Sequence, residues 1–189
     1  MKRIAITGGI GSGKTYISKV LRTHGINVYD CDAAAKNLML TSDEIIRRIK
    51  QTVGEDAYDS DGKLNKALLS SFIMLSEENK QAINNIVHPW VARDFMASGY
   101  RWLESAILFD SGFDKVVHFD EIICVTAPMD IRIRRIMARN GITHAAAKAW
   151  IGVQLPQEEI LRRSNHEILN DGERDIHQQV NQILNIIHE

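Results

Sequence analysis

The sequence predicts an α/β fold with three layers, in which a parallel sheet carries a nucleotide-binding loop. A short apolar strand, Ile4 to Ile6, is followed at once by a glycine-rich loop and then by an amphipathic helix that carries Ile17, Val20 and Leu21. Further short apolar runs occur downstream, separated by segments with helical spacing. Strands that alternate with helices in this way are typical of a sheet covered by helices on both faces.

The glycine-rich loop fits the phosphate-loop pattern G-x-x-x-x-G-K-[ST] from Gly8 to Thr15. Glycines allow the backbone to wrap closely around a polyphosphate, so that N–H groups and the following helix N-terminus point at its oxygens. Lys14 adds a positive charge for the β- and γ-phosphates, and the Thr15 hydroxyl can ligate Mg²⁺. The alternative is a glycine-rich turn that binds nothing, but here strand, loop, lysine, threonine and helix occur in the required order.

Length and composition predict one folding unit without a general affinity for nucleic acid or membranes. The 189 residues carry a formal net charge of -1, which gives no overall attraction to polyanions. Cys31 and Cys124 lie beside or within apolar segments and are expected to be reduced core thiols. The apolar residues after the basic start are too few for a signal peptide or a membrane span. We therefore expect a cytoplasmic protein.

Two carboxylates, Asp30 and Asp32, follow the second predicted strand, Ile26 to Tyr29. In open α/β sheets ligands gather beyond the carboxyl ends of the strands, so these acids are expected to face the mouth of the phosphate loop. An acceptor hydroxyl would need a base there. Alternatively, one Asp caps the predicted helix from Ala33 to Leu40. Both interpretations can hold, with one carboxylate as the cap and the other at the substrate.

Residues 41–100 show a helical pattern. A capping box at Thr41 predicts one helix, and another is expected to start near Ser76. His88 precedes Pro89, which disfavours helical geometry, so its ring could be aimed from a bend into a pocket. A packed, hydrogen-bonded histidine is the alternative. A helical block at this place could hold a second substrate, although the bare pattern indicates only an insertion.

The apolar run from Trp102 to Asp110 predicts a buried parallel strand that delivers the Asp110 carboxylate to the site. Walker B acids, which hold Mg²⁺ directly or through water, follow strands in this way. Another strand is expected over Glu121 to Thr126. A short apolar run that ends at Asn170 and a last amphipathic helix complete the chain.

A predicted helix that starts at Pro128 carries Arg132, Arg135 and Arg139 on one face, at spacing i, i+3 and i+7. Thr143 can cap the next helix. Such a pair of helices predicts a lid that covers the phosphates and supplies guanidinium groups to the charge that develops during transfer. A solvated basic face is the alternative.

In their order and spacing these motifs are similar to those of the dephospho-CoA kinase family, nearly from end to end. The resemblance rests on Thr7 to Thr15, Gly25 to Asp32, Val87 to Pro89, Leu108 to Asp110, the pair Arg135 and Arg139, and Ile168 to Asn170. It implies a P-loop kinase fold with a five-stranded parallel sheet in a single unit of residues 1–189. Its parts would be a core (1–32, 101–130 and 164–189), a helical acceptor-binding insertion (33–100) and a helical lid (131–163).

The resemblance also implies that ATP phosphorylates the ribose 3′-hydroxyl of dephospho-CoA, the last step of coenzyme A biosynthesis. The expected ATP-binding residues are Gly9, Gly11, Ser12, Gly13, Lys14, Thr15, Tyr16 and Asn170, with Thr15 on Mg²⁺. The expected acceptor-binding residues are Asp30, Asp32, Lys36, His88 and Asp110. The expected catalytic residues are Asp32 as the base, with Lys14, Arg135 and Arg139.

The chain departs from the family's common pattern at Lys36, Asn65, Lys66, Ile160 and Asn165. Since Arg and Lys are not interchangeable at bidentate phosphate contacts, Lys36 is expected to hold the acceptor differently from the usual Arg. Two other functions are considered: a kinase of nucleoside monophosphate or shikimate type, and an ATP-binding regulator without transfer activity. A GTPase is disfavoured, because the only Asn-Lys pair is not followed by the Asp of an N-K-x-D segment.

Overall fold

A computed structural model describes residues 2–188 of the chain. The chain divides into two compact units. One, the sheet unit, is formed by Met1–Tyr29 together with Tyr100–Glu189, and the other, the helical unit, by Asp30–Gly99. We describe each unit by itself.

The sheet is five-stranded and parallel, which confirms the predicted α/β class. Its order is β2-β3-β1-β4-β5, so that β1 lies at the centre between β3 and β4. The strands are β1 (Ile4–Thr7), β2 (Val28–Asp30), β3 (Trp102–Glu104), β4 (Glu121–Thr126) and β5 (His166–Leu169). The central place of β1 puts the loop that follows it at the middle of the sheet's carboxyl edge, where α/β proteins bind ligands.

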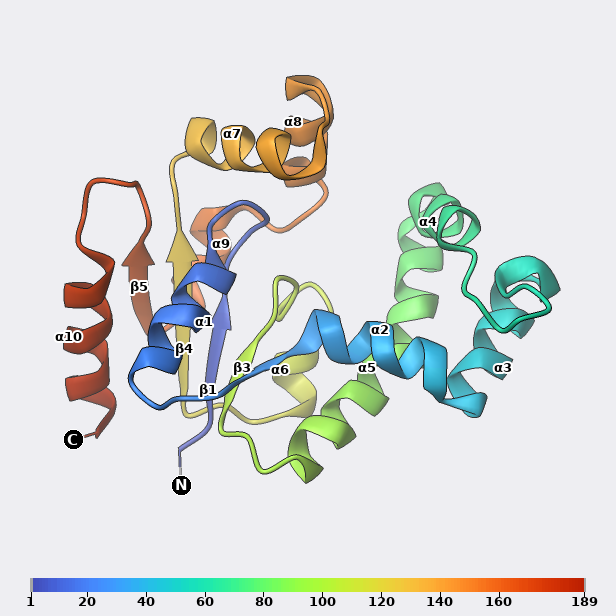
Figure 1. Ribbon diagram of the computed structural model, residues 1–189, viewed down its shortest axis with the longest axis horizontal. Helices are drawn as coiled ribbons and strands as arrows, with labels where there is room; N and C mark the ends of the chain where they lie inside the picture. The colour runs from blue at the N-terminus through green and yellow to red at the C-terminus, as the bar shows by residue number, and fades with distance from the viewer. Residues whose placement is uncertain (1, 189) are drawn as a thin grey trace. The chain divides into compact units, whose positions relative to one another are not determined.

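Helices cover both faces of the sheet, as the three-layer prediction required (Figure 1). On one face α1 (Lys14–Thr23) and α10 (Ile176–His188) pack against apolar side chains of all five strands. On the other face α9 (Gln157–Arg162) lies against β4. Both cysteines are buried, and burial raises the pKa of the Cys124 thiol to about 12. Among the described residues, no helix is long and apolar enough to span a membrane.

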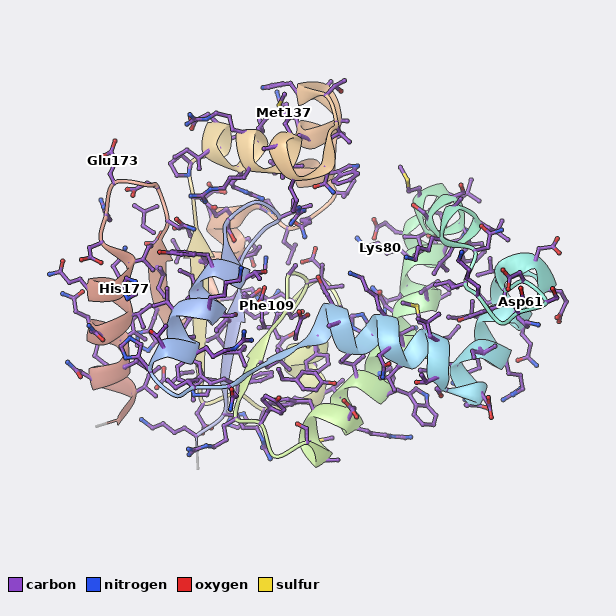
Figure 2. All side chains as sticks on the ribbon, viewed as in Figure 1. Asp61, Lys80, Phe109, Met137, Glu173 and His177 are labelled. Atoms are coloured by element: carbon purple, nitrogen blue, oxygen red, sulfur yellow. The ribbon has the colours of Figure 1, made fainter. Side chains whose placement is uncertain are left out.

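Two helices follow β4 and form the segment predicted as a lid. The first, α7 (Met129–Asn140), ends at Gly141, whose φ of 65° is the left-handed conformation that stops helices. The second, α8 (His144–Gly152), starts at Thr143, whose side chain accepts the N–H of Ala146. The helices pack through a small apolar cluster of Ile133, Ile136, Ala147 and Ile151, with Met137 (labelled in Figure 2) at its edge. The predicted helix–turn–helix is therefore confirmed.

The helical unit consists of short helices around one long one. They are α2 (Cys31–Thr41), α3 (Asp43–Val53), the 3₁₀ turn η1 (Glu55–Ala57), α4 (Lys66–Leu75) and α5 (Glu77–Ala97). The cap of α3 is Ser42, which accepts the N–H of Ile45, so the predicted capping box at Thr41 was wrong by one residue. Thr41 instead closes the last turn of α2.

Of the two interpretations of His88, the departure from helical geometry before Pro89 is not found, because α5 continues through Pro89. A proline inside a helix costs about 3 kcal/mol or more, since it removes one hydrogen bond and clashes with the preceding turn. Burial of the apolar face of α5 offsets this cost: Ile86, Val87 and Val91, on both sides of the proline, are all buried. Tertiary packing therefore overrides the local preference, and His88 lies within a helix.

The predicted strand from Trp102 to Asp110 was wrong in length. β3 ends at Glu104, and the residues that follow form turns before the short helix α6 (Phe113–Val116). Leu108 and Phe109 are buried, but they belong to these turns (Phe109 is labelled in Figure 2). An apolar run thus marked burial correctly without distinguishing a strand from a buried turn.

Candidate active site

The phosphate loop, residues 8–13, connects β1 to α1. Gly13 adopts a left-handed conformation with a φ of 98°, and its carbonyl accepts the N–H of Ile17 at 3.2 Å, so that α1 begins directly after the loop. The first turn of α1 contains no acidic side chain. The positive end of the helix dipole is therefore not compensated by the helix itself, which is the arrangement that binds phosphate groups.

Two glycines of the loop lie directly against neighbouring side chains. A Cβ atom on Gly9 would lie 2.2 Å from Nη2 of Arg132, and one on Gly13 would lie 2.1 Å from Nδ2 of Asn170. No Cβ atom can approach so closely, so a side chain at either position would displace its neighbour. The loop is packed against α7 and the segment after β5, a requirement additional to the predicted wrapping of phosphate.

Lys14 is buried, and its ammonium group lies against the loop backbone. Nζ donates to the carbonyl of Gly8 at 2.8 Å and, at 3.4 Å, to that of Gly9. The charge is thus held at the loop by neutral acceptors. A phosphate oxygen would be a stronger acceptor, since charge-assisted hydrogen bonds are roughly twice as strong as neutral ones. The structure therefore places the predicted lysine where it can transfer its hydrogen bonds to a ligand.

The acid at the end of β3 is Glu104, which our sequence interpretation missed. Thr15 Oγ1 donates to Glu104 Oε1 at 3.1 Å, and Ser18 Oγ donates to Oε2 at 2.7 Å. The Thr15 hydroxyl and the Glu104 carboxylate are hard oxygen ligands of the type that Mg²⁺ prefers, and Mg²⁺ commonly takes only one or two carboxylates. Among the described residues there is no group of three or more His, Cys, Asp or Glu that could hold a metal.

Asp110 lies in the turns beyond β3 and not at a strand end, so it does not occupy the position predicted for a Walker B acid. Its Oδ1 accepts the N–H of Leu155 at 3.0 Å, in the segment between α8 and α9. The physical reason is the early end of β3: five residues, 105–109, separate Glu104 from Asp110, and the chain forms turns there in place of a strand. Glu104 can be recognised in the sequence as the first carboxylate after the strand's buried pair Trp102 and Leu103.

Two of the three arginines that were predicted on one face of α7 contact the phosphate loop. Arg132 is only 3% exposed, and its Nε donates to the Ile10 carbonyl at 3.0 Å. Arg135 donates through Nη1 to the carbonyl of Ser12 at 3.2 Å. Burial lowers the pKa of both guanidinium groups, but Arg remains charged in proteins. Arg139, in contrast, is exposed, and its Nε donates to the side chain of Asn140.

Asn170 joins the lid to the loop. Its Nδ2 donates to the Ser12 carbonyl at 2.9 Å, and its Oδ1 accepts from Nη2 of Arg135 at 3.0 Å. Its backbone N–H donates to Thr126 O, which fixes the residue to the end of β4. The predicted contact of Asn170 with adenine stays a prediction, since no nucleotide is present.

The remaining predicted ATP-binding residues lie in the loop and at the start of α1. Ser12 is fully buried, and its Oγ has no hydrogen-bond partner among the described residues. Gly11 has a φ of 80° and lies against the backbone of α7. Tyr16 is 49% exposed. A buried hydroxyl without a partner within a phosphate loop is consistent with a site that accepts a polar ligand.

In the helical unit, Asp30 is the cap of α2: its Oδ1 accepts the N–H of Ala33 at 2.9 Å. The capping alternative is therefore confirmed for Asp30. Asp32 is exposed in the first turn of the same helix. Lys36 is also exposed and follows Asp32 by four residues, so the two side chains share a helix face.

His88, on α5, lies near Asp32 within the helical unit. Burial lowers the pKa of His88 below its usual 6.5, and the negative charge of Asp32 acts in the opposite direction. The net lowering favours the neutral imidazole at neutral pH. The structure thus brings together two of the predicted acceptor-binding residues, one acidic and one neutral.

The lowered pKa of His88 predicts a pH-dependent stability. In the unfolded chain the His88 imidazole binds a proton near pH 6.5, whereas in the folded chain it does so only at lower pH. The contribution of His88 to the free energy of unfolding is therefore complete above pH 6.5 and is lost as the pH falls toward the folded-state pKa. We expect His88→Gln to flatten the decrease in the urea midpoint between pH 7.5 and pH 5.5. His177→Gln, at an exposed position of α10, is the control and should keep the wild-type decrease; equal slopes in all three proteins would contradict the prediction.

Comparison with known proteins identifies the family to which this site belongs. The family profile described as dephospho-CoA kinase matches residues 2–175. A dephospho-CoA kinase of Bacteroides fragilis is 34% identical over 194 residues, covering 99% of this chain and 93% of the relative. That of Porphyromonas gingivalis is 37% identical over 177 residues, covering 90% and 86%.

Two solved structures support the fold. A crystal structure from Thermus thermophilus has a TM-score of 0.82 at 28% identity and covers 98% of this chain and 97% of its own. A dephospho-CoA kinase from Campylobacter jejuni has a TM-score of 0.66 at 19% identity, with 98% and 96% covered. At that identity the second similarity concerns the fold alone.

Proposed function

The chain belongs to the dephospho-CoA kinase family, and we propose that it transfers the γ-phosphoryl group of ATP to the ribose 3′-hydroxyl of dephospho-CoA, giving coenzyme A and ADP. The observation that carries the proposal is the complete phosphate loop on the central strand, within a match that covers nearly the whole chain. The substrates are small molecules, and we propose that the enzyme acts in the cytoplasm without nucleic acid or membrane.

On the ATP side, the loop amides, the α1 N-terminus and Lys14 neutralise the phosphates. Thr15 and Glu104 would hold Mg²⁺, which when bound supplies further positive charge to the β- and γ-phosphate oxygens. Arg135 adds a guanidinium group from the lid, close to the loop carbonyls that it contacts. Phosphoryl transfer depends mostly on positioning and electrostatic stabilisation, and these groups provide both.

Arg139 was predicted to act together with Arg135, and the proposal gives the two residues unequal shares. Arg135 is anchored to the loop and to Asn170, whereas Arg139 is exposed and bound to Asn140. We assign the larger share of charge stabilisation to Arg135. Arg139 contributes through the positive charge that it gives to the same helix.

On the acceptor side, we assign the base to Asp32, which would accept the proton of the 3′-hydroxyl. His88, neutral at pH 7, and Lys36, one turn from Asp32, would bind the acceptor, the lysine as a point charge for its phosphates. Asp30 contributes by fixing the start of α2.

The departure at Ile160 has a structural explanation. Ile160 is 1% exposed in α9, at a place where a basic side chain would have to be buried or turned outward. At another departure, Asn165 accepts the N–H of Ile122 and supports the start of β4. Both residues thus stabilise the sheet unit in this chain, and neither argues against transfer.

An assay of ADP release with different acceptors tests the proposed function. We expect turnover with dephospho-CoA and none above the ATP-only background with AMP, CMP or shikimate. Turnover with one of these acceptors and not with dephospho-CoA would assign a kinase of the nucleoside monophosphate or shikimate type. ATP binding without release of ADP under any condition would favour a regulator.

A further inference from the structure

One residue of the phosphate loop, Ile10, is held by the lid at three points. Its N–H donates to Oε1 of Gln154 at 2.7 Å, and its carbonyl accepts from Nε of Arg132 at 3.0 Å. Its side chain packs against the apolar cluster between α7 and α8, which includes Ile136 and Ile151. Both backbone hydrogen-bonding groups of this residue and its side chain are therefore bound by α7, α8 and the segment that directly follows α8.

The segment that carries Gln154 is fixed a second time at the next residue. The N–H of Leu155 donates to Asp110 Oδ1, in the turns beyond β3, at 3.0 Å. Gln154 and Leu155 thus connect the lid to the phosphate loop on one side and to the β3 turns on the other. All of these residues belong to the sheet unit, so the arrangement does not depend on the placement of the helical unit.

We propose that Gln154 is a positioning residue for phosphoryl transfer, which fixes the lid, and with it Arg135, relative to the phosphate loop. This inference rests on the proposed function. The bond is made at the third position of the loop pattern, one residue before Gly11. A neutral amide side chain accepts the Ile10 N–H without bringing a negative charge close to the polyphosphate, as a carboxylate would.

The position of this bond predicts how its loss appears in the kinetics. If Gln154 only sets the position of the lid, its removal leaves the ground-state contacts of ATP with the loop and Lys14 in place. The effect should then appear in kcat and much less in the KM for ATP, because an interaction that is needed only for transfer lowers kcat. A residue that merely stabilised the fold would change the unfolding midpoint without this split.

The experiment compares Gln154→Met with Gln157→Met. Methionine has a similar length and cannot accept a backbone hydrogen bond with comparable strength. Gln157, three residues after Gln154, is the matched control. Its Oε1 also accepts a backbone N–H, that of Ala127 at 3.1 Å, and this partner lies outside the phosphate loop. We expect Gln154→Met to lower kcat about 3- to 10-fold, the range for one hydrogen bond, with less than about a 2-fold change in the KM for ATP. Gln157→Met should keep wild-type kinetics.

Hydrogen exchange at the Ile10 amide gives a second readout that does not need turnover. Protection of this amide should fall in Gln154→Met and stay at the wild-type value in Gln157→Met. Gln154→Glu should retain protection, because a carboxylate oxygen can still accept the N–H. Unchanged protection and kcat in Gln154→Met, or equal losses in both Met variants, would overturn the inference. If the wild-type enzyme did not phosphorylate dephospho-CoA, the proposed function would fail, while the exchange data would still show whether Gln154 holds the loop.

Discussion

Replacing Lys14 by Met should reduce kcat by about 10²- to 10³-fold or more, the usual cost of removing one group that stabilises charge in a transition state. The structure makes this residue difficult to substitute, since its ammonium group is buried and held by the Gly8 and Gly9 carbonyls. Methionine keeps the apolar part of the side chain and removes the charge together with the hydrogen bonds to these two carbonyls. The measurement is steady-state ADP release at saturating dephospho-CoA.

Lys19→Met is the matched control for this variant. Lys19 lies on the same helix and is exposed, so its replacement removes one positive charge without changing the loop. We expect its kcat to stay within about 2-fold of wild type, because exposed charges beyond about 10 Å are largely screened at ordinary ionic strength. Lys14→Arg should not restore activity, since a planar guanidinium group cannot replace a compact ammonium group at this position. Lys14→Met with near wild-type turnover would remove the lysine from the mechanism.

The elements around the phosphate loop were predictable because their signals are local. β1, β4 and α7 each have an apolar pattern and a clear boundary residue in the sequence, and the structure places them as expected. The loop itself needs glycine, lysine and threonine at fixed spacing, and few other requirements produce that pattern. In this part of the chain the apolar pattern and the residues of the phosphate loop therefore predict the same structure.

The errors arose where tertiary contacts decide the structure. Trp102 to Asp110 contains a continuous apolar run, but its second half is buried in turns, so burial alone could not locate the end of β3. The same error moved the expected acid from Glu104 to Asp110. At Pro89 the local preference against helix was real, but packing on both sides of the proline was stronger.

The contacts behind the phosphate loop could not be predicted at all from the pattern. Arg132 and Gln154 lie more than 120 residues from Ile10, and nothing in their local sequence indicates that they bind its backbone. The sequence placed Arg132 and Arg139 on one face, yet one is buried under the loop and the other is exposed. Periodicity shows which residues share a helix face, whereas the fold decides which part of that face is covered.

Replacing Asp32 by Asn should reduce kcat by about 10²- to 10⁴-fold, the usual contribution of a general base, with little change in the KM for ATP. The structure simplifies this test, because the cap of α2 is Asp30. In the part of the chain that the structure describes, no hydrogen bond or ion pair of the Asp32 side chain is seen, and the residue is exposed. The substitution therefore removes a charge, and with it the electrostatic effect on His88, without removing the cap of α2.

Asp30→Asn is the matched comparison, since asparagine caps helices about as well as aspartate and the change removes the same charge two residues away. We expect it to act mainly through the KM for dephospho-CoA, and Asp32→Asn mainly through kcat. We expect the KM for ATP to be the same in both variants. A loss of less than about 10-fold in Asp32→Asn would mean that positioning and charge stabilisation suffice for transfer, because phosphoryl transfer with a loose transition state needs little help from a base. Equal losses of kcat in the two variants would instead indicate that the charge of the α2 N-terminus matters and not a proton acceptor at Asp32.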